Sequence, residues 1–108
     1  MNNVTKMGKV NHNMRLIGRM ILEDLKQEHS DVVRQIDAWC ADVEACSWDS
    51  PHDVKQRYGS ADFPGSNKAI FNIKGNKYRI LTTIDYQRKM VVVEKAGTHS
   101  EYNAWRIK

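Results

Sequence analysis

The 108-residue chain has few cysteines and no long apolar run. Cys40 and Cys46 are spaced neither as a zinc knuckle nor as a Cys-x-x-Cys redox pair, so we expect two reduced thiols in a cytoplasmic protein. Charged residues interrupt the most apolar stretch near the start, 14–25, which argues against a membrane span or a signal peptide there. The sequence also lacks a glycine-rich phosphate loop, a nucleophile elbow and a cluster of metal ligands. We therefore expect no metal, no cofactor and no membrane partner.

The length leaves room for one domain with one hydrophobic core. Residues 1–13 are polar and show no apolar periodicity, so we expect a flexible arm or an appended extension. The folded domain is expected to span residues 14–108.

Charge is distributed unevenly along a chain whose formal net charge is +4. Residues 14–62 are acidic overall, whereas residues 68–95 contain seven lysines and arginines against two carboxylates. A basic segment of this kind attracts a polyanion, and nucleic acid is the usual one. A solvated, charged sheet without any ligand is the alternative.

The pattern of apolar residues predicts an α+β fold. A short strand at 14–20 precedes helices at 21–29 and 31–46, and the second helix has Val32, Ile36, Trp39 and Val43 at helical spacing. Ser50-Pro51 begins a third, short helix that ends near residue 58, before a loop at 60–67. The remaining expected elements are strands at 68–74, 77–86 and 89–95 and a final short helix capped by Thr98 or Ser100.

The register of the first hairpin predicts two different sheet faces. A two-residue turn at Gly75-Asn76 places apolar residues opposite one another on the face that should meet the helices. These pairs are Ile73 with Tyr78, Phe71 with Ile80, and Ala69 with Thr82. The other face is expected to be a cationic plate that carries Lys68, Asn72, Lys74, Lys77 and Arg79.

Three segments carry a resemblance to a known family. Ala61-Asp62-Phe63, the run Phe71-Asn72-Ile73-Lys74-Gly75-Asn76-Lys77-Tyr78-Arg79, and Gly97-Thr98-His99-Ser100-Glu101-Tyr102 resemble HigB toxins in order and spacing. The chain is also similar to the broader RelE superfamily. The resemblance implies a RelE-like fold: an N-terminal strand and a helical hairpin on a twisted, mainly antiparallel sheet, with a short C-terminal helix. It departs at Asn103, where the family often has Asp.

The resemblance also implies a function. Its members are toxins of type II toxin–antitoxin systems that cleave mRNA as metal-independent endoribonucleases, on translating ribosomes, and thereby stop translation and growth. The implied partners are mRNA, the ribosome and a HigA-like helix-turn-helix antitoxin.

Metal-free RNA cleavage needs proton transfer and cations against the reacting phosphate. We expect Arg79 to stabilise the transition state, since a guanidinium binds two phosphate oxygens at once. His99 is the expected acid or base, and Tyr102 would stack on a base or orient the phosphate. The alternatives are an Arg79 paired with a carboxylate, a His99 that caps the last helix, and a Tyr102 that packs on the sheet. Expected RNA contacts are Lys68, Asn72, Lys74, Asn76, Lys77 and Arg88.

Two other functions fit the same residues. One is a non-catalytic module that binds RNA or the ribosome through the cationic face, and the other is a protein-interaction domain whose basic face docks an acidic partner. A DNA-reading repressor is disfavoured, because no expected helix gathers base-contacting side chains.

Overall fold

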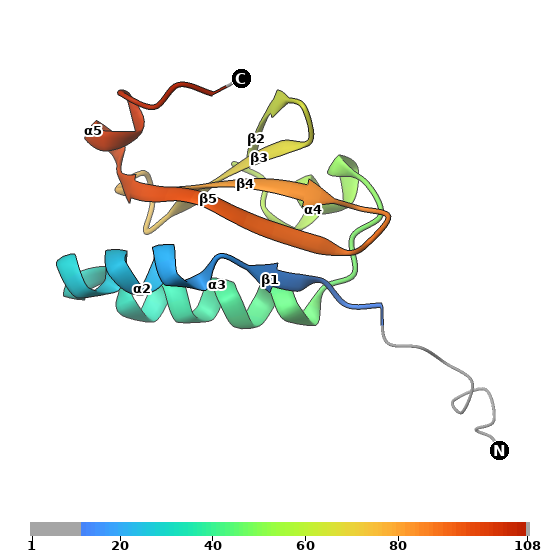
Figure 1. Ribbon diagram of the computed structural model, residues 1–108, viewed down its shortest axis with the longest axis horizontal. Coiled ribbons are helices and arrows are strands. Elements are labelled where there is room, and N and C mark those ends of the chain that lie inside the picture. The colour runs from blue at the N-terminus through green and yellow to red at the C-terminus, as the bar shows by residue number, and fades with distance from the viewer. Residues whose placement is uncertain (1–11, 108) are drawn as a thin grey trace, which may run out of the picture.

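The computed structural model describes residues 12–107 and shows a five-stranded sheet with two long helices across one face (Figure 1). The strand order is β1-β5-β4-β3-β2; β1 is parallel to β5, and the other neighbours are antiparallel. The predicted α+β, RelE-like architecture is confirmed. In chain order the elements are β1 (Arg15–Ile17), α2 (Arg19–Glu28), the 3₁₀ turn η1 (Ser30–Val32), α3 (Val33–Ala45), α4 (Pro51–Arg57), β2 (Asp62–Gly65), β3 (Lys68–Ile73), β4 (Tyr78–Asp85), β5 (Met90–Thr98) and α5 (His99–Tyr102).

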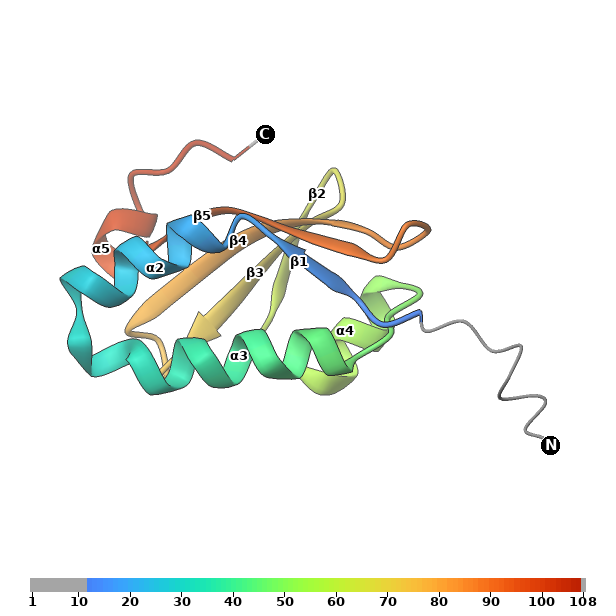
Figure 2. The same cartoon turned by 60° about the horizontal axis from the view of Figure 1, so that its bottom comes forward.

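Helices α2 and α3 form an antiparallel pair that covers one face of the sheet (Figure 2). The predicted apolar stripe of α3 is buried, with Ile36 and Val43 fully enclosed and Trp39 only 3% exposed. The Trp39 ring meets the Phe71 ring of β3 edge-on, at 5.2 Å between centroids. Each such side chain contributes about 1.5–3 kcal/mol when it is buried, so this seam fixes α3 on the sheet.

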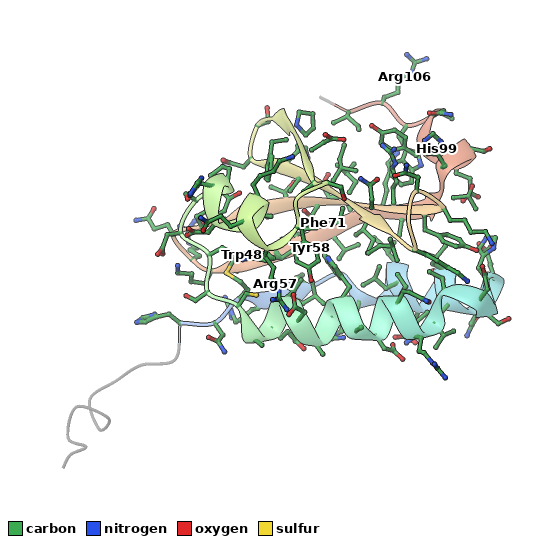
Figure 3. All side chains as sticks on the ribbon, turned by 180° about the vertical axis from the view of Figure 1, so that it is seen from behind. Trp48, Arg57, Tyr58, Phe71, His99 and Arg106 are labelled. Atoms are coloured by element: carbon green, nitrogen blue, oxygen red, sulfur yellow. The ribbon has the colours of Figure 1, made fainter. Side chains whose placement is uncertain are left out.

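A cluster of three aromatic rings connects α4 to the same core (Figure 3). Trp48 stacks on Phe71 at 6.2 Å, and Tyr58 meets Phe71 edge-on at 5.2 Å. The predicted start of α4 is confirmed, because the Ser50 hydroxyl accepts a hydrogen bond from the Asp53 backbone N–H at 3.4 Å. This cap satisfies a donor that a helix start otherwise leaves unpaired.

The register predicted for the first hairpin is confirmed, but its turn differs. Ile73 pairs with Tyr78 and Phe71 with Ile80, and these residues are buried beneath the helices. The connection has four residues, 74–77, and φ is positive at Lys74 (56°) and Gly75 (67°). A loop of two residues and a loop of four residues, both centred on the Gly75–Asn76 peptide bond, give the same strand pairing. The predicted faces of the paired residues are therefore correct although the loop is longer than expected.

The loop expected at 60–67 contains a strand. β2 pairs with β3 through Asp62 with Ile70 and Gly65 with Lys68, and the register shifts between these pairs. Pro64 and Gly65 hid this strand from the pattern, because both are typical of loops and tolerated at a sheet edge. β5 is also longer than the expected strand and continues to Thr98.

The second face of the sheet is covered only in part. α5 and the C-terminal segment lie over it, on the side away from α2 and α3 (Figure 1). Ile70 and Leu81 on this face are 2% and 3% exposed, so it is not the open cationic plate that we expected. The alternation rule placed Lys68, Asn72 and Arg79 on this face and missed these two apolar residues.

Three further expectations concern the N-terminal arm, the two cysteines and the absence of a membrane span. The arm or extension expected at 1–13 lies almost entirely outside the described residues. In the part that is described, both cysteines are free, Cys40 buried and Cys46 half-buried. None of the helices seen between residues 12 and 107 has the length and apolar character required to traverse a bilayer.

Candidate functional site

Arg79 lies near the start of β4, between Asn72 on β3 and Gly97 on β5. Its guanidinium carbon is 4.3 Å from the centroid of the Tyr102 ring. Within residues 12–107 no carboxylate pairs with Arg79, and its Nε atom has no hydrogen-bond partner. The alternative of an arginine neutralised by a carboxylate is therefore not observed. The guanidinium keeps donors for an incoming anion.

α5 is built by a capping box at the end of β5. The Thr98 hydroxyl accepts from the Glu101 N–H at 3.2 Å, and the Glu101 carboxylate accepts from the Thr98 N–H at 2.8 Å. Thr98 and Glu101 therefore satisfy each other's backbone donors, which permits a helix of only four residues. Gly97 allows the close approach of this turn, because a Cβ there would lie 2.5 Å from Glu101 Oε1.

This short helix brings His99 and Tyr102 to the same place as Arg79. The His99 and Tyr102 rings meet edge-on with centroids 6.0 Å apart, and the Trp105 ring lies 5.5 Å from Tyr102. Tyr102 thus contacts both the Arg79 guanidinium and the His99 imidazole. The cap of α5 comes from Thr98, so the His99 side chain is not used for capping.

Lys74 and Lys77 lie elsewhere than predicted. Their ammonium groups reach Asp31 in η1, at 3.3 Å and 3.1 Å, on the side of the sheet that the helices cover. The Tyr78 hydroxyl donates to the same carboxylate at 2.7 Å. The expected plate fails here because Lys74 sits in a left-handed turn, which releases its side chain from the strand's alternation.

Asp31 is the electrostatic centre of this corner. The Tyr78 hydroxyl and the two ammonium groups hold its pKa well below the usual carboxyl range. Burial together with the hydrogen bond to Asp31 raises the pKa of Tyr78 to about 12. At neutral pH the carboxylate is therefore charged and the phenol protonated.

Lys68 and Arg88 lie farther from Arg79. Lys68 pairs with Thr83, four residues along β4 from Arg79, which is about 14 Å at strand spacing. Its ammonium group is half-buried and bonds Glu94 at 2.7 Å. Arg88 pairs with Asp85 at 3.0 Å, in the turn at the opposite end of β4.

The two predicted asparagines have different surroundings. Asn72, opposite Arg79, donates through Nδ2 to the Ser60 carbonyl at 2.9 Å, while its Oδ1 has no partner in the described chain. Asn76 is exposed and lines a groove beside His99.

Three residues near this region were missed by the sequence pattern. Lys95, next to Leu81 on the partly covered face, and Arg106, in the C-terminal segment (Figure 3), form no ion pair among residues 12–107. His29, seventy residues before His99, lines the same groove as His99. The charge count could have singled out Lys95, but no local signal in the sequence relates His29 to His99.

No three histidine, cysteine, aspartate or glutamate side chains converge as a metal site within the described residues. The side chains around Arg79 are cationic, aromatic and imidazole groups, which suit an anion.

The chain matches the model of a known protein family. The model of HigB toxins, described as the RelE-like toxic component of a toxin–antitoxin system, matches residues 33–105, about two thirds of the chain. The chain belongs to the HigB toxin family. The matched range of this chain includes Arg79, His99 and Tyr102. It begins after β1, α2 and His29. No curated protein matches this HigB chain.

Proposed function

We propose that this HigB-family toxin is a metal-independent endoribonuclease that cleaves mRNA on the ribosome. Membership of the family makes it the toxic component of a toxin–antitoxin system. The observation that supports the nuclease activity is the contact series in which Tyr102 touches both the unpaired guanidinium of Arg79 and the imidazole of His99. These groups combine phosphate binding with proton transfer on one surface.

In this proposal the RNA supplies its own nucleophile, the 2′-hydroxyl next to the scissile phosphate. Arg79 donates to the phosphate oxygens as negative charge builds up on them, and this charge stabilisation is usually the largest catalytic effect. His99 transfers a proton at one of the two reacting oxygens. Tyr102 holds the guanidinium by a cation–π contact and offers its ring edge to a base.

The RNA backbone would follow the unpaired cations. Lys95 and Arg106 extend this surface from β5 and the C-terminal segment. A base contact from Asn72 would require its buried, unpartnered Oδ1 to become exposed. Asn76 and Lys77 line the groove at His99. Contacts from Lys68, Lys74, Lys77 and Arg88 would require each to share a carboxylate partner with the phosphate.

The proposed partners follow from this function. Because mRNA and translating ribosomes are cytoplasmic, the proposed function implies that the protein acts in the cytoplasm. A HigA-like helix-turn-helix antitoxin would silence the toxin, either by covering the basic surface or by blocking its entry to the ribosome.

Induced expression in cells that lack the antitoxin, with mapping of mRNA 5′ ends, tests the proposal. The wild-type protein should arrest growth and produce new 5′ ends within reading frames. Arg79→Ala should slow cleavage about 10²–10³-fold, the usual loss when one donor to the transition state is removed. Arg79→Lys should recover only part of this rate, because an ammonium cannot bind two oxygens in a fixed plane.

Arg34→Ala is the matched control, since it removes the same charge from an exposed position of α3, the helix on the other face of the sheet. It should cleave within a few-fold of wild type. Ribosome binding without any cleavage by the wild-type protein would instead favour the non-catalytic module.

A further inference from the structure

A groove lies at the end of the sheet where α2 ends and α5 begins. Both views place α5 and the end of α2 at the same end of the molecule (Figures 1 and 2). The groove has a volume of about 830 Å³, within the range of small-molecule sites. Residues from three parts of the chain line it, among them His29, Lys77, Tyr78, Thr98, His99 and Ser100.

His29 is held in this groove by its backbone and by one ring contact. It follows the last residue of α2, and its N–H donates to the Leu25 carbonyl at 2.9 Å. Its ring meets the Tyr78 ring edge-on at 5.3 Å, and Tyr78 is fixed by its hydrogen bond to Asp31. The imidazole nitrogens form no hydrogen bond within the described chain, so they are available to a ligand.

His99 also lines the groove, and its imidazole, like that of His29, has no hydrogen-bond partner in the described chain. Its backbone N–H donates to the Lys77 carbonyl at 3.1 Å, which ties α5 to the hairpin turn. Its ring contacts Tyr102. Two half-buried imidazoles with free nitrogens therefore line one groove.

Two of the titratable groups around them, Asp31 and Tyr78, keep one protonation state near neutral pH. From η1, Asp31 is held ionised by Tyr78, Lys77 and Lys74, and Tyr78 itself is held protonated. From α5, the Glu101 carboxylate accepts a hydrogen bond from the Thr98 N–H, and the Tyr102 ring contacts His99. Imidazole is the side chain that most often transfers protons in catalysis, and the groove presents two of them.

We propose that His29 and His99 are the two proton-transfer residues of this HigB toxin, one at the 2′-hydroxyl and the other at the leaving 5′-oxygen. This inference rests on the proposed RNA cleavage. The neutral imidazole removes the 2′ proton, and the 2′-oxygen forms a bond to phosphorus. The phosphorus–5′-oxygen bond breaks, and the second imidazole, as a cation, protonates the 5′-oxygen. The products are a 2′,3′-cyclic phosphate and a 5′-hydroxyl.

Substitution of His29 tests the pairing, with wild-type toxin and mRNA-programmed ribosomes as the reference. His29→Gln should slow cleavage about 10²–10⁴-fold, the usual contribution of one proton-transfer group. The bell-shaped pH dependence of the wild type should lose one limb, and added imidazole should restore part of the rate. His52→Gln, at an exposed position of α4, is the matched control and should change neither the rate nor the profile.

His29→Phe separates chemistry from packing, because phenylalanine can retain the edge-on contact with Tyr78. This variant should fold with a melting temperature close to wild type and still lose the same pH limb. If it cleaves at the wild-type rate with an unchanged profile, His29 only supports Tyr78 and the inference is overturned.

A substrate with sulfur in place of the leaving 5′-oxygen shows which histidine is the acid. A thiolate leaves without protonation, so a variant that lacks only the acid should regain its rate on this substrate. Recovery by one of His29→Gln and His99→Gln, but not by the other, supports the pair, and recovery by neither overturns it. A wild-type protein that cleaves neither substrate would refute the nuclease proposal itself, whereas normal cleavage by His29→Gln would refute only the pairing.

Discussion

Gly97→Ala should loosen the packing of α5 on the sheet without disturbing the helical core. A Cβ at this position would lie 2.5 Å from Glu101 Oε1 and 3.3 Å from Trp105 Cζ2, and both atoms belong to the segment that follows β5. The Glu101 carboxylate, at the end of a flexible side chain, must therefore move away, and the Trp105 ring must yield by a few tenths of an ångström.

The cost can be worked from the contacts that are lost. Moving the Glu101 carboxylate breaks its hydrogen bond to the Thr98 N–H, and loss of a cap costs about 1 kcal/mol. Crowding against Trp105 adds about 1 kcal/mol at the low end for overpacking. A loss of about 2 kcal/mol should lower the melting temperature by about 8 °C for a chain of this size.

Thermal unfolding and the indole N–H resonance of Trp105 together measure the effect. The Trp105 resonance should shift, whereas those of Trp39 and Trp48 should not, because these two lie in the core beneath the other face. Cleavage should fall as well, since α5 positions His99 and Tyr102.

Gly59→Ala is the matched control, because a Cβ there meets nothing within 4 Å. Its free energy of unfolding should change by no more than about 0.5 kcal/mol, the usual limit for a surface substitution. A Gly97→Ala protein with the stability and Trp105 resonance of wild type would refute the account of how α5 is held.

Two further predictions concern the fold. Gly18→Ala should destabilise by more than 1 kcal/mol, because φ is +91° there and a Cβ would lie 2.6 Å from the Val93 carbonyl oxygen; a urea midpoint equal to wild type would contradict this. Arg57 and Tyr58 donate to Asp42, and these bonds lower the pKa of that carboxyl in the folded state. The stability from Asp42 is therefore complete above the unfolded pKa of about 3.9 and lost as pH falls through the lower folded value. Asp42→Asn should be less stable at neutral pH and should lose less stability on acidification, and parallel acid titrations of the two proteins would argue against the pairing.

Much of the fold could be predicted because its signals are local. The helical spacing of Ile36, Trp39 and Val43 gave α3, Ser50-Pro51 gave the start of α4, and the hairpin alternation gave its register. Each depends on residues a few positions apart, where the backbone geometry leaves few choices. The resemblance to HigB toxins, carried mainly by the last third of the chain, predicted the family. It also singled out Arg79, His99 and Tyr102, which the fold brings into contact.

Local patterns failed where a side chain chose a distant partner. Lys74 and Lys77 bond Asp31, more than forty residues earlier, and Lys68 bonds Glu94 across the sheet, so Arg79 is the one cation of the predicted plate that stays unpaired among the described residues. β2 was missed because its pairing with β3, rather than its composition, makes it a strand.

The sequence by itself determined which segments are helices and strands, which sheet face is apolar, and that a basic, HigB-like segment ends in an imidazole and a phenol. Only the tertiary structure decided which cations stay unpaired and which groups meet, because ion pairs and grooves form between segments that chain folding brings together. His29 shows the difference most clearly: the sequence leaves it isolated, and the fold brings the end of α2 and the start of α5 to the same end of the sheet, where His29 and His99 line one groove.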